Sequence, residues 1–201
     1  MTLVVVHGRD QDPAYMEEHF VEPLERPDLA YVVPAADARS WYPVSFLAPR
    51  SENEPRLGHA LDRMDALRRE LESTGVDRTT IVWVGFSQGA CLVTEYVARA
   101  PYRFGALVAL TGGLIGPDVA SLSRPHQKRG MPVLFGTSDV DPFVPLARVE
   151  ATAELFLEAG AEVDVAVYPG ATHEIVADEI LRSRLVVAKV EAGITARAVD
   201  G

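Results

Sequence analysis

The sequence predicts an α/β fold, a doubly wound and mostly parallel sheet covered by helices. Short apolar runs rich in β-branched residues alternate with stretches of helical period, a pattern typical of parallel strands joined by helices. Most of these runs are continuously apolar, as expected for strands buried on both faces. Helical connections between parallel neighbours cross over right-handed, which restricts the topology to a doubly wound sheet. The length of 201 residues, with no visible linker or repeat, predicts a single domain over residues 1–201.

The predicted strands are short runs in which valine and leucine recur. They cover residues 3–6, 30–33, 80–84, 106–110, 132–135 and 163–168. Two connections between the predicted elements are long, residues 37–54 and residues 116–130. Because the sheet holds such loops in place, we expect them to contribute to a functional site.

The predicted helices place their apolar residues on one face. They cover residues 55–72, 90–100, 145–159 and 175–190. In the first of them, the shared face carries Leu57, Leu61, Met64, Leu67 and Leu71. In the third, Pro145 suits the first helical turn and Gly160 suits the end of the helix.

Composition argues against several classes of function. The formal net charge is −10, whereas nucleic acids and anionic membranes both require a basic surface. Cys91 is the only cysteine, so no intrachain disulfide forms and cysteine usage gives no support for secretion. The apolar run after Met1 is too short for a signal peptide or a membrane span. We therefore expect a cytoplasmic protein that binds neither nucleic acid nor membrane.

The strongest functional signal is the pentapeptide Gly85-Phe86-Ser87-Gln88-Gly89. It stands between an apolar strand and an apolar helix, the context in which G-x-S-x-G is typical of an α/β-hydrolase nucleophile. A strained, sharp turn there projects the serine hydroxyl above the sheet, and the glycines let strand and helix approach closely. The Gln88 N–H opens the helix and can donate to an oxyanion. Ser87 is the predicted nucleophile, the alternative being a serine that only caps the helix.

A serine of this kind needs an imidazole to take its proton and a carboxylate to orient the imidazole. In this fold the chain order is serine, acid, histidine. Of the five histidines, only His173 follows the last predicted strand, on a glycine-bearing loop before a helix. His7 precedes the serine in a His-Gly turn, where we expect a structural hydrogen-bonding role. His173 is therefore the predicted base.

The acid is expected in the loop after the strand at residues 132–135. This loop reads Gly136-Thr137-Ser138-Asp139-Val140-Asp141-Pro142. Two aspartates qualify by position, Asp139 and Asp141, and Asp139 has the more usual distance from the preceding glycine. The aspartate that is not the acid is expected to bind local backbone amides.

The pentapeptide resembles that of the phospholipase/carboxylesterase family, which includes acyl-protein thioesterases and small bacterial carboxylesterases. Four further motifs are similar to those of the family, in its oxyanion turn, its tryptophan-bearing cleft loop, its acid motif and its histidine turn. They are Val6-His7-Gly8-Arg9, Ser40-Trp41-Tyr42-Pro43, Asp141-Pro142-Phe143-Val144-Pro145 and Gly170-Ala171-Thr172-His173-Glu174. The resemblance covers essentially residues 3–190.

The resemblance implies an α/β-hydrolase fold with no large lid, and it favours Asp141 as the acid, through the family's Asp-Pro-x-Val-Pro motif. It assigns the two oxyanion donors to the backbone N–H groups of Arg9 and Gln88. The family usually has a second glycine where this chain has Asp10. Because both donors are backbone groups, we expect the oxyanion hole to survive this change.

Substrate contacts are expected from Trp41, Tyr42 and Phe46 in the first long loop, with packing in the core as the alternative role of these aromatic residues. Neither long loop has the length of a lipase lid, so we expect an open, shallow site for small or flexible acyl groups. No His-Glu-x-x-His, Cys-x-x-Cys, Walker or Gly-x-Gly-x-x-Gly motif is present. No metal or other cofactor is therefore implied.

These observations predict a serine carboxylesterase that forms an acyl-enzyme on Ser87 and releases it with water activated by His173. Its partner is a small-molecule ester or thioester, and a homodimer is left open. The same machinery permits thioesterase or lysophospholipase-type activity on longer acyl chains. A non-catalytic, ligand-binding member of the fold is the alternative from another class, and the presence of every expected site residue disfavours it.

Overall fold

The computed structural model describes residues 1–199, with side chains described to residue 196, and these residues form a six-stranded sheet. The strand order is β2-β1-β3-β4-β5-β6, and each neighbouring pair is parallel. The strands are β1 (Thr2–Val6), β2 (Ala30–Val32), β3 (Ile81–Phe86), β4 (Ala106–Leu110), β5 (Pro132–Thr137) and β6 (Glu162–Val167). The predicted α/β class is confirmed. Residues 200–201 of the predicted domain lie outside the described residues.

The register of the sheet lines up apolar side chains from all of its central strands. One row joins Val4, Trp83, Leu107, Val133 and Val163, each paired with the next across the sheet. The first four of these residues are buried and the last is half-buried at the edge. Helices on both faces explain why the strand sequences are continuously apolar.

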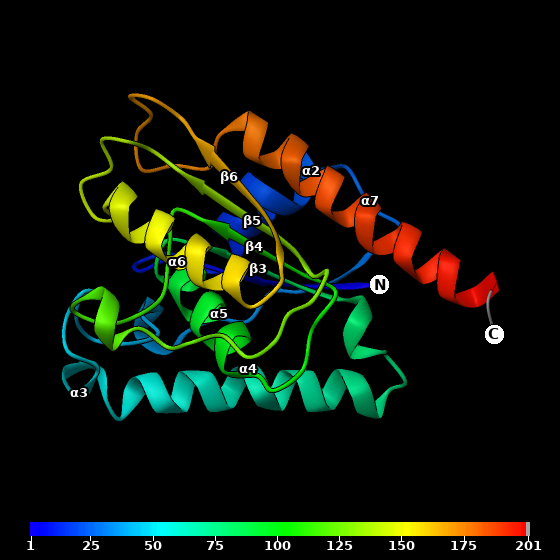
Figure 1. Ribbon diagram of the computed structural model, residues 1–201, viewed down its shortest axis with the longest axis horizontal. Coiled ribbons are helices and arrows are strands. Elements are labelled where there is room, and N and C mark those ends of the chain that lie inside the picture. The colour runs from blue at the N-terminus through cyan, green and yellow to red at the C-terminus, as the bar shows by residue number, and fades with distance from the viewer. Residues whose placement is uncertain (200–201) are drawn as a thin grey trace.

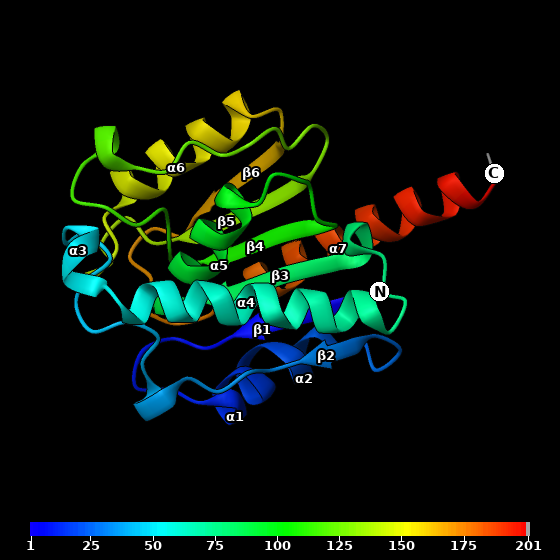
Figure 2. The same cartoon turned by 90° about the horizontal axis from the view of Figure 1, so that it is seen from below.

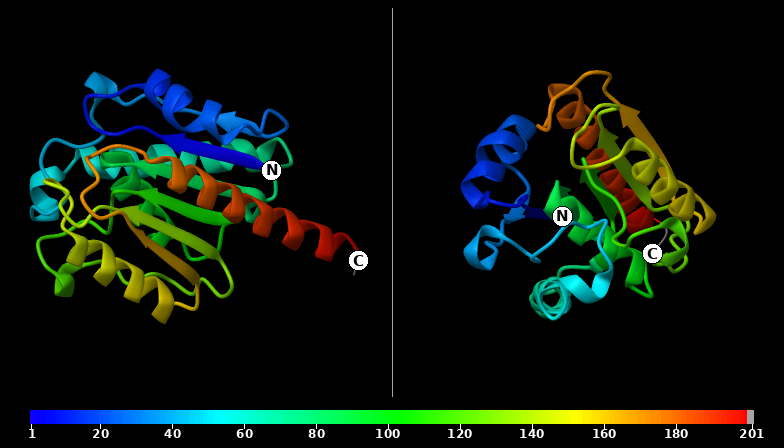
Figure 3. Two further views of the ribbon diagram at one scale, coloured as in Figure 1. Left: turned by 90° about the horizontal axis from the view of Figure 1, so that it is seen from above. Right: turned by 90° about the vertical axis from the view of Figure 1, so that its left-hand side faces the viewer.

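Helices cover both faces of the sheet (Figures 1 and 3). One face carries the consecutive turns α1 (Pro13–Met16), η1 (Glu17–Val21) and α2 (Glu22–Leu24), together with α7 (Ala177–Val199). The other face carries α4 (Arg56–Ser73), α5 (Gln88–Arg99) and α6 (Leu146–Glu158). The short helix α3 (Arg50–Asn53) lies in the loop before α4. Helix α5 packs on β3 and β4, at the centre of the sheet.

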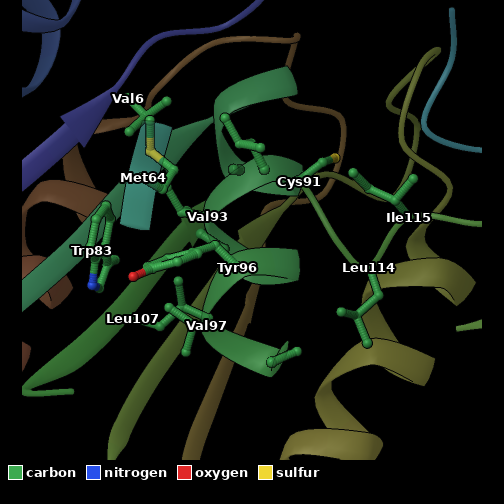
Figure 4. Close-up of a cluster of buried hydrophobic side chains, with 14 of the residues drawn as sticks. Val6, Met64, Trp83, Cys91, Val93, Tyr96, Val97, Leu107, Leu114 and Ile115 are labelled. Carbon is green, nitrogen blue, oxygen red and sulfur yellow. The ribbon is translucent and has the colours of Figure 1, made fainter. Parts of the chain in front are cut away.

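An aromatic group anchors α5 to the sheet. The Trp83 ring packs edge-on against Tyr96, with centroids 4.8 Å apart, and against Phe104 at 5.6 Å. Figure 4 shows Trp83 and Tyr96 within the larger apolar cluster, with Met64 of α4 close by. Such burial of large apolar side chains supplies most of the driving force for folding, and it fixes α5 against the sheet through Tyr96.

The carboxyl ends of the strands lie at the end of the molecule opposite the two termini, the end at which α3 also lies (Figure 2). In doubly wound sheets, ligands bind at this edge. Among the described residues, no helix has both the length and the apolar character needed to cross a membrane.

Candidate active site

Ser87 lies on a strained turn between β3 and α5. Its backbone has φ 53° and ψ −119°, a conformation that costs a non-glycine residue about 1–3 kcal/mol and that persists where the surroundings enforce it. The Ser87 N–H donates to the Leu110 carbonyl of the neighbouring strand at 2.9 Å. This hydrogen bond fixes the turn to the neighbouring strand β4.

The glycines on either side of Ser87 are required by close packing of backbone on backbone. A Cβ atom at Gly85 would lie 2.5 Å from the carbonyl carbon of Gly89. A Cβ atom at Gly89 would lie 2.3 Å from the Val6 carbonyl oxygen. Both distances are shorter than any van der Waals contact, so a larger residue would push α5 away from β3 or β1. The G-x-S-x-G spacing thus follows from how the helix sits on the sheet.

His173 lies on the loop between β6 and α7 with its ring directed at Ser87. The His173 Nε2 atom is 2.9 Å from the Ser87 Oγ atom, although the two residues are 86 positions apart in the chain. The imidazole packs against two aromatic rings, with centroids 5.2 Å from Phe86 and 5.0 Å from Phe143. These contacts limit its rotation, and the His173 side chain is 20% exposed.

The structure brings Asp141, and not Asp139, to the histidine. The Asp141 Oδ2 atom is 2.6 Å from His173 Nδ1, and the Asp141 side chain is fully buried. Its other oxygen accepts hydrogen bonds from the N–H groups of Phe143 and Val144. Both oxygens of the buried carboxylate are thus hydrogen-bonded, as burial of a charge requires.

Asp139 has a different partner on the histidine loop. Its Oδ1 atom accepts a hydrogen bond from the Gly170 N–H at 2.8 Å, and the residue is exposed. This bond links the loop after β5 to the loop that carries His173. The two aspartates therefore contact the same neighbouring loop at different points.

The turn after β1 passes directly beside Ser87. A Cβ atom at Gly8 would lie 3.1 Å from the Ser87 Cβ atom. His7 is fully buried under this turn, where its Nδ1 contacts the Gly8 carbonyl at 2.7 Å and its Nε2 accepts from the Ala36 N–H at 3.0 Å. Because Nε2 accepts, the proton is on Nδ1 and is donated to Gly8. Burial lowers the pKa of His7, which keeps the ring in this neutral form.

This hydrogen bond matters for the neighbouring residue. The Gly8 carbonyl belongs to the same peptide group as the Arg9 N–H, so the His7 ring orients the expected oxyanion donor. The residue that follows, Asp10, has φ 61°, in the region that glycine adopts most easily. Its N–H donates to the Arg39 carbonyl at 2.8 Å. This left-handed backbone is compatible with the glycine that the sequence resemblance implies at this position.

A cleft of about 560 Å³ opens in front of Ser87. Its lining comprises Arg9, Asp10, Tyr42, Val44, Ser45, Phe46, Leu47, Ser87, Gln88, Cys91, Pro142, Phe143, Val144 and His173. Most of these residues come from the cleft loop, which we define as residues 40–47, and from the loop after β5. Most of the wall is apolar, and Phe143 is 63% exposed at the cleft. The arrangement suits an acyl group that carries no charge.

The expected substrate-binding residues divide into two groups. Tyr42 and Phe46 line the cleft, and both are largely buried. Trp41 is not among the lining residues. Its indole N–H donates to the His7 carbonyl at 2.8 Å, and its ring packs at 5.1 Å from the His7 ring. Trp41 therefore fastens the cleft loop to the turn after β1.

Cys91 lies at the inner end of the cleft and is buried. Burial raises the pKa of its thiol to about 12, so the thiol is uncharged at neutral pH. Because the thiolate is the nucleophilic form, Cys91 is a small wall residue and does not compete with Ser87.

The structure also contains a buried carboxyl that no sequence motif indicates. Glu179, in the first turn of α7, is 1% exposed, and its Oε2 accepts a hydrogen bond from the Val176 N–H at 2.9 Å. A Cβ atom at Gly136 would lie 2.1 Å from its Oε1, so the carboxyl packs on the end of β5. Burial raises its pKa to about 7.

Glu179→Gln is expected to stabilise the protein at pH 8 by roughly 1–3 kcal/mol. Because burial raises the pKa from its ordinary 4.5 to about 7, the unfolded chain loses this proton at lower pH than the folded chain. Stability contributed by the protonated form is therefore lost as pH rises from about 4.5 through the folded pKa of about 7. Urea unfolding of both proteins across this range should show a difference that grows with pH, and a constant difference would contradict this account.

Among the described residues, no group of three histidine, cysteine, aspartate or glutamate side chains is arranged to hold a metal ion. The arrangement that does exist is a hydrogen-bonded chain from carboxylate to imidazole to hydroxyl, beside a helix start and an apolar cleft. Such a chain can activate an oxygen nucleophile for acyl transfer.

Comparison with known proteins agrees with this geometry. The profile of a family described as Phospholipase/Carboxylesterase matches residues 2–189. Acyl-protein thioesterase 1 from Saccharomyces cerevisiae is 27% identical over 183 residues, which cover 86% of this chain and 78% of the yeast protein. Esterase YpfH from Escherichia coli is 24% identical over 183 residues, covering 86% of this chain and 75% of the relative.

Solved structures give the same result. The crystal structure of a phospholipase/carboxylesterase from Dyadobacter fermentans superposes with a TM-score of 0.83 at 34% identity, covering 93% of this chain and 89% of that one. SOBER1 from Arabidopsis thaliana, at 18% identity, shares the fold with a TM-score of 0.76 over 94% of this chain and 98% of that one. The chain belongs to the phospholipase/carboxylesterase family.

Proposed function

We propose that this protein hydrolyses carboxylic esters of small or flexible acyl groups through an acyl-enzyme on Ser87. Its family and its named relatives support an esterase or thioesterase as the class of enzyme. The observation that carries the proposal is the chain of hydrogen bonds from Asp141 through His173 to Ser87, at 2.6 Å and 2.9 Å, at the edge of an apolar cleft.

In the proposed reaction, Ser87 Oγ attacks the substrate carbonyl carbon while His173 Nε2 takes the hydroxyl proton. Asp141 holds the Nδ1 proton and stabilises the imidazolium that forms. The N–H groups of Arg9 and Gln88 receive the negative oxygen, the second of them at the positive end of α5. His173 then gives its proton to the leaving alcohol or thiol, and activates a water molecule that releases the acid.

Thioester hydrolysis is the second candidate. It is supported by the yeast relative named acyl-protein thioesterase 1, and the same groups would serve it because a thiolate leaves more readily than an alkoxide. Lysophospholipase-type activity on longer chains is the third candidate. Arg9 is the arginine of the cleft lining, and its guanidinium is bound to backbone carbonyls. This leaves little to attract a phosphate.

A series of substrates tests both the proposed activity and the role of the cleft in binding the acyl group. The wild-type protein is expected to hydrolyse p-nitrophenyl acetate, butyrate and octanoate as well as thioesters of the same acyl groups, and to hydrolyse lysophosphatidylcholine least. Because its exposed ring lies at the cleft, Phe143→Ala should lower kcat/KM for octanoate by about threefold to tenfold, the value of one aromatic contact. Acetate should be affected less.

Val140→Ala is the matched control for that series. Val140 is 62% exposed on the same loop but does not line the cleft, so its replacement should leave the chain-length preference unchanged. Absence of turnover of every ester and thioester by the folded wild-type protein would refute the proposed function. Equal effects of Phe143→Ala on all chain lengths would refute the role of Phe143 alone.

A further inference from the structure

The Arg9 side chain is bound to three consecutive carbonyls of the cleft loop. Its Nη1 donates to Pro43 at 2.7 Å, and its Nη2 donates to Tyr42 at 3.0 Å and to Val44 at 2.7 Å. Among the described residues, no carboxylate forms an ion pair with Arg9, in contrast to most of the arginines of this chain. The Arg9 guanidinium thus binds the backbone of the cleft loop.

Gln88 sends its side chain to the same loop. Its amide oxygen accepts from the Trp41 N–H at 2.9 Å, and its amide nitrogen donates to the Tyr42 carbonyl at 2.7 Å. The two residues whose N–H groups are assigned to the oxyanion hole therefore both use their side chains to hold the cleft loop. The Tyr42 carbonyl accepts a hydrogen bond from each of these two side chains.

The loop held in this way forms much of the cleft wall, through Tyr42, Val44, Ser45, Phe46 and Leu47. Three of its backbone carbonyls face the Arg9 side chain, while these side chains line the space in front of Ser87. The peptide group between Gly8 and Arg9 is also held by the buried His7 ring, which is hydrogen-bonded to the Gly8 carbonyl. The next residue, Asp10, has a left-handed backbone conformation.

We propose that the Arg9 guanidinium is a positioning group that ties the oxyanion turn to the cleft loop, so that the two move as one unit. The inference rests on the proposed function, because it takes the Arg9 N–H as an oxyanion donor. Its physical basis is that one residue carries the donor on its backbone and the anchor on its side chain. Displacing the anchor then displaces the donor, and misplacement by about 1 Å can cost a hundredfold in rate.

The geometry demands an arginine. A planar guanidinium has five N–H donors in a fixed arrangement and can reach three carbonyls at once. A lysine ammonium is a compact point charge on a flexible stem and would bind fewer of these carbonyls in a less defined position. We therefore expect Arg9→Lys to recover part, but not all, of what Arg9→Ala loses.

The test compares Arg9→Ala and Arg9→Lys with Arg56→Ala. Arg56, on α4, also donates to carbonyls just before and within the cleft loop, those of Asp37 and Ser40, but it has no part in the oxyanion turn. Arg9→Ala should lower kcat for p-nitrophenyl butyrate by about tenfold to a hundredfold, with a much smaller change in KM. Arg56→Ala should leave kcat close to the wild-type value.

Binding of an alkyl trifluoromethyl ketone gives an independent measurement. This ketone forms a tetrahedral oxyanion on the serine, so its Ki should rise in Arg9→Ala by about the same factor as kcat falls. Added methylguanidinium should restore part of kcat in Arg9→Ala and none in Arg56→Ala. A rise in KM with kcat unchanged would overturn the coupling and leave Arg9 as wall support only.

The outcome remains readable if the variant is less stable. Thermal unfolding and fluorophosphonate labelling of Ser87 measure the folded, reactive fraction, and kcat is expressed per labelled site. A lower Tm of Arg9→Ala together with a wild-type kcat per labelled site would also overturn the inference. Failure of the proposed function is distinct, because it would appear as absent turnover and labelling in the wild-type protein.

Discussion

Ser87→Ala is expected to lower kcat for p-nitrophenyl butyrate by about ten-thousandfold to a millionfold, the usual effect of removing a catalytic serine. The Oγ atom is the group that His173 Nε2 contacts at 2.9 Å, and no other hydroxyl is hydrogen-bonded to that nitrogen among the described residues. Purified variant and wild type would be compared in steady-state assays. Circular dichroism would verify that both proteins are folded. We expect them to be, because the substitution removes a single oxygen atom and creates no clash.

Ser45→Ala is the matched control for this result. Ser45 also lines the cleft, but its Oγ accepts a hydrogen bond from the Leu47 N–H and has no bond to the imidazole. We expect its removal to change kcat by much less than removal of Ser87. If the two variants lost activity to a similar extent, the assignment of the nucleophile would be wrong.

Asp141→Asn should lower kcat by about a thousandfold to ten-thousandfold. The asparagine oxygen can still accept from the N–H groups of Phe143 and Val144, as Oδ1 does now. Its NH2 group, however, would face His173 Nδ1 and favour the tautomer with the proton on Nε2, which cannot accept the serine proton. The pH dependence of kcat and the chemical shifts of the His173 ring protons would both report this change.

Asp139→Asn is the paired substitution two residues earlier in the same loop. An asparagine oxygen can replace the carboxylate oxygen that accepts from Gly170, so we expect a loss of less than about threefold. A severe effect of Asp139→Asn with a mild effect of Asp141→Asn would reverse the assignment. If both variants kept near wild-type activity, neither aspartate would be the acid.

Much of the fold follows from local patterns in the sequence. Each predicted strand lies within two residues of an observed one, because most of the strands are short apolar runs buried on both faces. The helix predicted over residues 175–190 is longer at its carboxyl end, since α7 runs from Ala177 to Val199. Polar and small residues beyond 190 weaken the apolar stripe, so periodicity alone gives no reason to extend the helix.

The residues that meet at the site were predictable where a motif places them at the end of a strand. Ser87 and His173 follow β3 and β6, and parallel strands bring such ends to one edge of the sheet. The choice between Asp139 and Asp141 was not predictable from spacing. It depends on how the loop after β5 curls around the amides of residues 143 and 144, which is a property of the folded loop.

Hydrogen bonds between a side chain and the backbone of a distant loop could not be predicted from the sequence pattern. Nothing in the composition around Arg9 indicates that its guanidinium binds three carbonyls of a loop more than 30 residues away. Trp41 illustrates the converse, because an aromatic residue in a polar loop suggested substrate contact, whereas its indole is bound to His7. Local sequence patterns do not show such contacts, because they join residues that are far apart in the chain and meet only in the folded structure.

The proposed function requires that folding creates a reactive serine at position 87. The most direct measurement is labelling of the native wild-type protein with a fluorophosphonate, followed by mass spectrometry of the modified peptide. We expect stoichiometric modification of Ser87, which prior unfolding abolishes and which is strongly slowed in His173→Ala. No labelling of the native protein, or modification of Ser45 instead, would contradict it.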